Sequence, residues 1–238
     1  MVLPWHNFNF FNNATISAKP RIAISACLNG EAVRYDGTDK LLETTSTMLP
    51  KHLTLLPICP EVGAGLSVPR PPVQLVQTDH ALEVIGRHDK TLNVTTALHT
   101  FRQQCHRHIH HRLCGYIFKS HSPSCGLNST PIFNSQDEQI GIGSGLQADY
   151  FQQQMPWLYL QDESQLQTDR QCQQFIMQCL LSFDLQQGSQ DSGLAAIHQH
   201  YQFLIDKLTN RSQALLQTCV RNQAQTRYWT LLLKALKE

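Results

Sequence analysis

Short apolar runs alternate with longer segments of helical periodicity along the first two thirds of the chain. Three runs, at residues 21–26, 53–58 and 115–119, are rich in β-branched or other apolar side chains and are predicted to be strands. The run at 53–58 is apolar enough that we expect it to be buried on both faces. A further run at 157–160 is predicted to be a last, edge strand.

Three segments between these runs are predicted to be helices. Apolar side chains recur every three or four residues within 92–113, which is typical of an amphipathic helix. Residues 39–49 are predicted to form a helix that Pro50 ends, and residues 146–154 are predicted to form another. Strands that alternate with helices favour a parallel sheet.

The remaining segments of this region carry turn and loop signals. Residues 73–76 and 81–85 alternate weakly around a polar turn and predict a hairpin. Residues 63–72 are rich in Gly and Pro and are expected to lack regular structure, and residues 140–145 are expected to be a flexible, glycine-rich loop.

The last third of the chain has a helical pattern throughout. One helix is predicted at about 165–183, followed by a polar linker at 186–192. A long helical segment is predicted at 193–236, with a break near Asn210. Glutamine supplies much of the polar surface here.

These elements predict an α/β fold: a Rossmann-like, mostly parallel sheet flanked by helices, with an α-helical C-terminal extension. The predicted division is a polar leader at 1–20, the α/β domain at 21–160 and the helical extension at 161–238. A chain of 238 residues is long enough for such a domain and an appendage.

Composition narrows the possible environments and partners. The formal net charge of +1 gives no strong signal for nucleic acid, which needs clustered Lys and Arg. The first residues lack the cationic start and continuous apolar core of a signal peptide, and no run is long enough to span a membrane. We therefore expect a cytoplasmic protein whose eight cysteines are reduced, and the sequence leaves its oligomeric state open.

Three of the cysteines share one setting. Cys27, Cys59 and Cys125 each follow an apolar, strand-like run and open a loop of small or turn-forming residues. Because parallel strands leave their carboxyl ends on one edge of a sheet, these thiols are expected to meet in space.

Several kinds of site are consistent with this pattern. Taken singly, each thiol is more often a small buried side chain. A structural zinc site would want a fourth ligand and close Cys-x-x-Cys pairs, and a lone nucleophilic cysteine would leave the other two without a role. A three-cysteine iron–sulfur cluster uses all three and leaves one iron open.

The neighbouring residues resemble the motifs of the thiouracil desulfidase (TudS-like) family. The resemblance covers residues 21 to about 150 and keeps the order of the family's motifs. The matching motifs are Ser-Ala-Cys-Leu-x-Gly at 25–30, Val-Arg-Tyr-Asp-Gly at 33–37, Cys-Pro-Glu-Val-x-Ala-Gly-Leu-x-Val-Pro-Arg at 59–70 and Lys-Ser-x-Ser-Pro-Ser-Cys-Gly at 119–126. Residues 156–181 also resemble the segment that follows this domain in longer relatives.

The resemblance implies a cofactor, a reaction and a set of site residues. The cofactor is a [4Fe-4S] cluster, and the reaction is the non-redox desulfuration of 2- or 4-thiouracil to uracil and sulfide. The implied cluster ligands are Cys27, Cys59 and Cys125. The implied catalytic residues are Glu61 and Ser122, and the expected substrate-binding residues are Ser122, Ser124 and Lys119.

The chemistry of these residue types agrees with that reaction. A C=S carbon is attacked more readily by water when its sulfur is bound to a Lewis acid, and sulfur prefers a soft, thiolate-bound iron. Glu61 would take a proton from the attacking water, and Ser122 would hydrogen-bond a ring atom or relay a proton. By themselves, Glu61 and Ser122 could equally be a surface carboxylate and a turn hydroxyl.

Two positions depart from the family pattern. The family's last loop commonly has an arginine between two glycines, where this chain has Ser144. His121 also stands where arginine is usual. If the family's arginine steadies the substrate or the cluster, the substrate preference of this chain is expected to differ, and the sequence leaves the consequence of Ser144 open.

Other cysteines and histidines are predicted to be structural. Residues 105–114 hold two cysteines and four histidines, but Cys105 lies on the apolar stripe of the predicted helix and the histidines are expected on its solvated face. Cys172, Cys179 and Cys219 are predicted to lie in helix cores.

The sequence therefore predicts an iron–sulfur enzyme that removes sulfur from a small thiolated nucleobase or nucleoside. Two alternatives stay open: a non-catalytic iron–sulfur or zinc sensor, and an enzyme that transfers the sulfur instead of releasing it.

Overall fold

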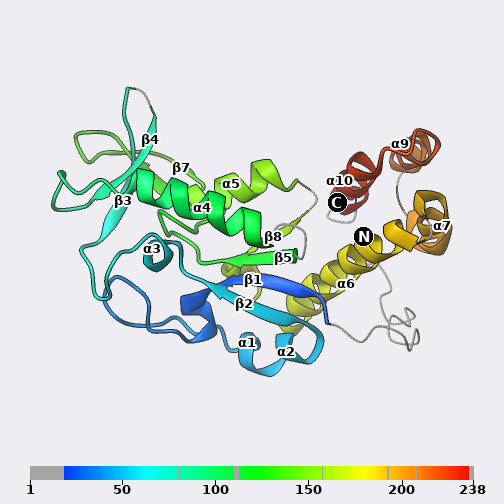
Figure 1. Ribbon diagram of the computed structural model, residues 1–238, viewed down its shortest axis with the longest axis horizontal. Helices are drawn as coiled ribbons and strands as arrows, with labels where there is room; N and C mark the ends of the chain where they lie inside the picture. Colours follow the sequence, from blue (N-terminus) through cyan, green and yellow to red (C-terminus); the bar gives the residue numbers. More distant parts are fainter. Residues whose placement is uncertain are drawn as a thin grey trace.

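The computed structural model describes residues 19–79, 81–109, 113–156, 158–191, 193–206, 208 and 210–235. The predicted leader lies almost entirely outside the described residues, as do the predicted strand residue Trp157 and the end of the helix predicted at 92–113. A mixed α/β body and a helical region follow one another along the longest axis of the molecule (Figure 1).

The first sheet contains the predicted strands in parallel arrangement. Its order is β2-β1-β5-β8, and each neighbouring pair is parallel. The strands are β1 (Arg21–Ser25), β2 (Thr54–Ile58), β5 (Leu113–Phe118) and β8 (Tyr159–Asp162). The carboxyl ends of all four strands therefore lie on one edge of the sheet, and the predicted fold class is confirmed.

Strand β2 is more exposed than the sequence predicted. It is an outer strand of the sheet, and exposed and partly buried side chains alternate along it. Leu56 is 36% exposed. The prediction of burial on both faces is wrong because an apolar run does not distinguish a central strand from an edge strand.

A second sheet of order β4-β3-β6-β7 lies beside the first sheet's carboxyl edge and was not predicted as a unit. Its antiparallel pair β3 (Val73–Gln77) and β4 (Leu82–Gly86) confirms the predicted hairpin. Strand β6 (Thr130–Phe133) pairs in parallel with β3 and antiparallel with β7 (Gln139–Gly143). The predicted loop at 140–145 is wrong: glycine alternates with isoleucine there, and the segment is an edge strand.

The segment predicted as one helix at 39–49 contains less helix than expected. Two four-residue helices, α1 (Thr44–Thr47) and α2 (Leu49–His52), begin later in it. Pro50 lies in the first turn of α2, where its missing N–H costs little, so it does not end the helix. Helix α3 (Pro60–Gly63) overlaps the predicted loop at 63–72 by one residue, Gly63.

Helices cover both faces of the first sheet. Helices α4 (Thr95–Ile109) and α5 (Leu146–Gln154) pack on one face, around Phe151 and Tyr116. Helix α6 (Asp169–Asp191), with α1 and α2, packs on the other face, where Phe175 contacts the central strands. The predictions of α4 and α5 are confirmed.

The predicted polar linker at 186–192 is wrong for the described residues, because α6 continues through Asp191. Glutamine is a good helix former, so a polar, glutamine-rich stretch does not break a helix. The predicted break near Asn210 is confirmed. The helices after α6 are α7 (Gly193–His200), α8 (Gln202–Ile205), α9 (Asn210–Arg221) and α10 (Gln225–Ala235).

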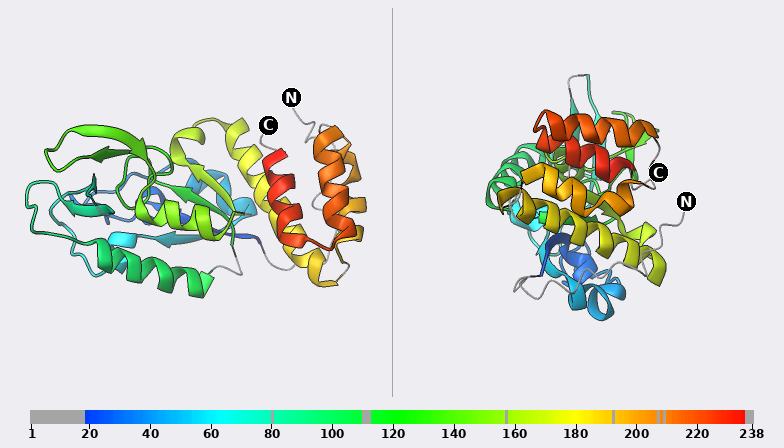
Figure 2. Two further views of the ribbon diagram at one scale, coloured as in Figure 1. Left: turned by 90° about the horizontal axis from the view of Figure 1, so that it is seen from above. Right: turned by 90° about the vertical axis from the view of Figure 1, so that its right-hand side faces the viewer.

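The helices after α6 have their own core. Tyr201, Leu216 and Tyr228 are fully buried in it, and Leu181 of α6 joins it. Figure 2 shows these helices gathered at one end of the molecule. Helix α6 therefore packs against both the first sheet and the helices that follow it. Among the described helices, none combines the length and apolar character that crossing a membrane requires.

Candidate active site

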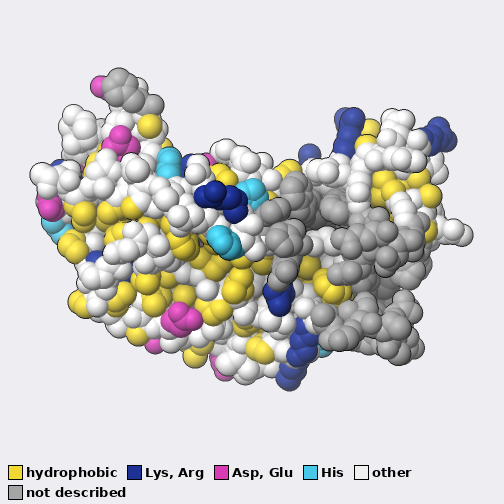
Figure 3. All heavy atoms as spheres, in the orientation of Figure 1, with side chains coloured by type: hydrophobic (Ala, Val, Ile, Leu, Met, Phe, Trp, Pro, Cys, Tyr) yellow, Lys and Arg dark blue, Asp and Glu magenta, His cyan; other side chains and the backbone are white. Residues whose placement is uncertain are grey.

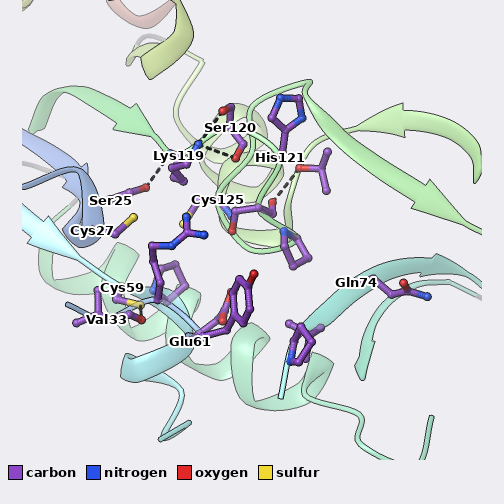
Figure 4. Close-up of a pocket in the computed structure, with 18 of the residues that line it drawn as sticks. Ser25, Cys27, Val33, Cys59, Glu61, Gln74, Lys119, Ser120, His121 and Cys125 are labelled. Carbon is purple, nitrogen blue, oxygen red and sulfur yellow. Dashed lines mark hydrogen bonds between the residues drawn. The ribbon is translucent and has the colours of Figure 1, made fainter. Parts of the chain in front are cut away.

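The carboxyl edge of the first sheet opens into a cavity of about 440 Å³. The segments that follow β1, β2 and β5 form one side of it, and Gln74 of the second sheet lies on the opposite side (Figure 4). Phe133 of β6 also lines the cavity. The sheet topology thus places three loops, far apart along the chain, around one space.

The three strand-end cysteines line this cavity together. Cys27 lies in the short 3-10 helix Ala26–Asn29 directly after β1, and Cys59 lies between β2 and α3. Cys125 lies in the loop after β5. Cys27 and Cys125 are buried and Cys59 is partly buried. The expected convergence of the loops is therefore present.

Burial dominates the electrostatics of these thiols. It raises the pKa of Cys27 to about 11, and the neighbouring charge of Cys59 adds to the rise. Burial likewise raises the pKa of Cys59, and it raises the pKa of Cys125 well above the usual value although the Ser25 hydroxyl lowers it. A metal centre reverses this preference, because coordination deprotonates a thiol.

Within the described part of the chain, no three His, Cys, Asp or Glu side chains are placed to hold a single metal ion.

Glu61 lies one residue into α3 and is only 8% exposed. Its carboxylate accepts a hydrogen bond from Arg70 Nε at 2.7 Å on Oε2 and one from Ser124 Oγ at 2.8 Å on Oε1. Because each carboxylate oxygen has two lone pairs, both oxygens keep the capacity to accept a further proton. The hydrogen bonds from Arg70 and Ser124 fix the position of the carboxylate. Because Glu61 also lines the cavity, its remaining lone pairs are within reach of a bound molecule.

Ser122 also lines the cavity, in the loop after β5. Its hydroxyl oxygen accepts hydrogen bonds from the backbone N–H of Ser124 at 3.3 Å and of Cys125 at 3.1 Å. The hydroxyl is thus an acceptor within its own loop, which leaves its proton available for donation toward the cavity.

The other two expected substrate-binding residues are engaged with the protein. Ser124 is fully buried, donates to Glu61 and is not one of the cavity-lining residues. Lys119 lines the cavity, but its ammonium donates to Glu163, to Ser120 Oγ and to the Ser120 carbonyl. Three acceptors match the three N–H bonds of a lysine.

The two positions that depart from the family pattern differ in location. His121 lines the cavity, and its Nδ1 lies 2.8 Å from the carbonyl oxygen of Ser129. Ser144 Oγ instead bonds the side chain and backbone N–H of Asn128, at 3.0 and 2.9 Å, and is not one of the cavity-lining residues.

Sequence reasoning missed three charged residues at the site. Arg70 bridges Glu61 to the Val33 and Ser67 carbonyls, at 2.9 and 3.2 Å, and Asp162 and Glu163 bond the loop after β5. Arg70 ends a motif quoted above, and the two acidic residues follow a predicted strand. That strand-end position was the available signal.

The histidine-rich segment makes structural contacts where it is described. Cys105 is partly buried in the core under α4, and His106 Nδ1 lies 3.2 Å from the Tyr150 hydroxyl. His108 is exposed, and His110 and His111 lie outside the described residues. The predicted core positions of Cys172, Cys179 and Cys219 are confirmed by their burial.

On the face of the molecule in Figure 3, Lys and Arg side chains are dispersed over several elements.

Comparisons with known proteins agree with this arrangement. A solved structure described as a [4Fe-4S]-dependent thiouracil desulfidase, TudS, matches the fold with a TM-score of 0.50 at 28% sequence identity. The match covers 62% of this chain and 93% of the TudS chain. A comparison with curated protein sequences found no match. The model of the 2-thiouracil desulfurase family matches residues 22–163, which is more than half of the chain, and the chain therefore belongs to that family.

Proposed function

We propose that this protein is a [4Fe-4S]-dependent thiouracil desulfidase. In this proposal Cys27, Cys59 and Cys125 hold the cluster, and the substrate is a thiolated pyrimidine that is converted to uracil and sulfide. The observation that carries the proposal is that three strand-end thiols line one cavity together with Glu61 and Ser122.

The donor set fits a cluster. Thiolate is the preferred protein ligand of iron–sulfur clusters, and each ligand binds a different iron. Three thiols that line one cavity match the donor set of a cluster with one iron left open, whereas a structural zinc ion takes four protein ligands. When bound, the cluster supplies an iron with no protein ligand, which acts as a soft Lewis acid toward the sulfur of the substrate.

Glu61 and Ser122 take part in different proton transfers. A Glu61 oxygen accepts a proton from the water that attacks the C=S carbon, which is general-base catalysis. A new C–O bond forms, the C–S bond breaks and the sulfur leaves as sulfide. Arg70 and Ser124 hold the carboxylate in the orientation that this step requires.

Ser122 acts on the ring. Its hydroxyl already accepts two N–H bonds, so it donates its proton to a ring nitrogen or oxygen of the substrate. Lys119 and Ser124 stay candidate substrate-binding residues; their observed contacts favour support of Ser120 and of Glu61. The cavity volume is within the range of small-molecule sites and accommodates a nucleobase or nucleoside.

Anaerobic reconstitution tests the proposal. We expect brown protein that binds iron and releases one sulfide for each uracil formed from 2- or 4-thiouracil, or from the corresponding nucleoside. Bovine serum albumin treated with the same iron and sulfide serves as the control for chemical desulfuration.

Three results would overturn the proposal. Colourless protein that binds one zinc ion would favour a zinc sensor. A bound cluster with no turnover of any thiopyrimidine would favour an iron–sulfur sensor. Substrate sulfur that stays on a protein thiol as persulfide would favour sulfur transfer.

A further inference from the structure

Two adjacent carboxylates stand at the carboxyl end of β8 and are almost fully buried. Asp162 is 4% exposed and Glu163 is 8% exposed. Burying a carboxylate costs free energy unless hydrogen-bond donors surround it. Both residues have such donors, and most of these donors belong to the loop that follows β5.

Glu163 binds the beginning of that loop. One of its oxygens accepts the backbone N–H of Ser120 at 2.5 Å. The other accepts the Ser120 hydroxyl at 2.7 Å and the ammonium of Lys119. Hydrogen bonds to an ionised group are stronger than those between neutral groups.

Asp162 binds the end of the same loop. Its Oδ2 accepts the Ser129 hydroxyl at 2.9 Å, and its Oδ1 accepts the backbone N–H of Ser164 at 3.0 Å, which fixes the carboxylate. Ser129 in turn contacts His121, whose backbone N–H donates to the Ser129 hydroxyl at 3.2 Å. The two ends of the loop are thus joined to one dipeptide.

The sheet explains why this dipeptide reaches the loop. Strands β5 and β8 are parallel neighbours, and Phe118 of β5 is in register with Asp162 of β8. The chain leaves both strands at the same edge, one as the loop and the other as the turn Glu163–Gln165 that leads into α6. The side chains that follow Phe118 therefore meet those of Asp162 and Glu163.

Glu163 also affects the charge beside Cys27. Lys119 and Cys27 line the same cavity, and the Lys119 ammonium donates to Glu163. The ion pair between Lys119 and Glu163 therefore places compensating charges next to one of the three cavity thiols.

We propose that Asp162 and Glu163 are positioning residues for the active site. Together they hold both ends of the loop that carries Ser122 and Cys125, and Glu163 additionally balances the charge of Lys119 beside Cys27. The second part of this inference rests on the proposed cluster, whereas the first part does not.

Hydrogen–deuterium exchange of the metal-free protein tests the first part. We expect Glu163→Gln and Asp162→Asn each to raise amide exchange within residues 119–129 by about tenfold, the equivalent of losing a charge-assisted hydrogen bond. Glu138→Gln is the matched control, because Glu138 is exposed and bonds Asn134 in the turn before β7. Unchanged exchange in both Glu163→Gln and Asp162→Asn would overturn the inference even if the protein binds a cluster.

The reduction potential of the reconstituted protein tests the second part. Glu163→Gln keeps an acceptor for Ser120 but leaves Lys119 uncompensated, so we expect a more positive potential and a kcat that falls more than KM rises. Replacing Lys119 by Met in the same variant should restore the potential, and Asp162→Asn should leave it unchanged. Identical potentials in Glu163→Gln and wild type would overturn the charge-balancing role. If wild type binds no cluster, the proposed function fails while the exchange result stands.

Discussion

Two groups of cysteines lie in different settings around the first sheet. One group lines the cavity at the carboxyl edge: Cys27, Cys59 and Cys125. The other group is buried between the sheet and α6: Cys114, Cys172 and Cys179. Both groups are largely sheltered from solvent, so burial alone does not distinguish a ligand from a core side chain.

The surroundings of the two groups differ. The interior thiols pack against Phe175, Ile176 and other apolar side chains. Adding a Cβ at Gly115 would bring it within 2.7 Å of Cys179 Sγ, so the packing around that sulfur is tight. The edge thiols line a cavity together with Glu61, Arg70 and Lys119. Cys27 also belongs to the same apolar core as the interior thiols, so the difference between the groups is access to the cavity and not contact with the core.

The largest expected effect separates the two groups by iron content. Replacing any one of Cys27, Cys59 or Cys125 by Ala should reduce bound iron to a small fraction of wild type and abolish detectable sulfide release, because each removes a proposed cluster ligand. Cys179→Ala is the control and should bind iron normally. Iron and sulfide analysis after anaerobic reconstitution measures this. A Cys27→Ala protein with a full cluster would remove Cys27 from the ligand set.

A loss of activity that leaves the cluster in place is expected when Glu61, which lines the same cavity as the edge thiols, is replaced. Glu61→Gln should lower kcat by about 10²–10⁴-fold, the range for loss of a general base, while the visible absorbance of the cluster is kept. Glu138→Gln, an exposed substitution, should keep full activity. Retained activity in Glu61→Gln would assign the proton transfer to another group.

For the free energy of unfolding, replacing an interior thiol is expected to have the larger effect and replacing an edge thiol the smaller one. In the metal-free protein, Cys179→Ala should lower the free energy of unfolding by about 1–2 kcal/mol, because it leaves a void in a packed core. Cys59→Ala should cost less, since Cys59 is partly buried beside a cavity. Urea unfolding compares the two variants. Equal losses would mean that the cavity wall is packed as tightly as the core.

The smallest expected effect is a pH dependence from a thiol that belongs to neither group. Burial raises the pKa of Cys105 from 9.0 to about 11. Because the unfolded chain then loses its proton at lower pH than the folded chain, stability should be full below pH 9 and fall as pH rises toward 11. With discounting for partial exposure, the loss attributable to Cys105 is about 1 kcal/mol.

The difference between wild type and Cys105→Ala isolates that loss. The variant should fall less steeply in unfolding free energy between pH 8 and pH 11. Parallel curves for the two proteins would show that other groups, such as the buried tyrosines, cause the alkaline loss.

The sequence predicted those elements whose local pattern coincides with their environment. Helix α5 and the hairpin of β3 and β4 follow the expected ranges closely. The errors occurred where the environment overrides the pattern. Residues 140–145 have the composition of a loop, but pairing with β6 makes 140–143 part of a strand, and only 144–145 lack regular structure. Leu56 is apolar, but its strand lies at the edge of the sheet.

The candidate site shows the same division. The three thiols and Glu61 were predictable because they directly follow strands in one recognisable set of motifs. The roles of Arg70 and Glu163 were not, because they arise from contacts with Glu61 and Ser120 that only the folded chain brings about. Nor could the sequence show that Ser124 lies behind Glu61 and that Lys119 is already paired.

The contacts of Asp162 and Glu163 with the loop after β5 set the order in which the parts of the site can form during synthesis. During synthesis, Cys27 and Cys59 leave the ribosome long before the loop with Cys125, and the residues that fasten this loop come later still. A nascent chain that stops short of residue 163 has all three thiols but lacks the anchor of the third. Under the proposed function, cluster binding would follow release of β8 from the ribosome, and the cysteines that emerge earlier would have to stay reduced until then.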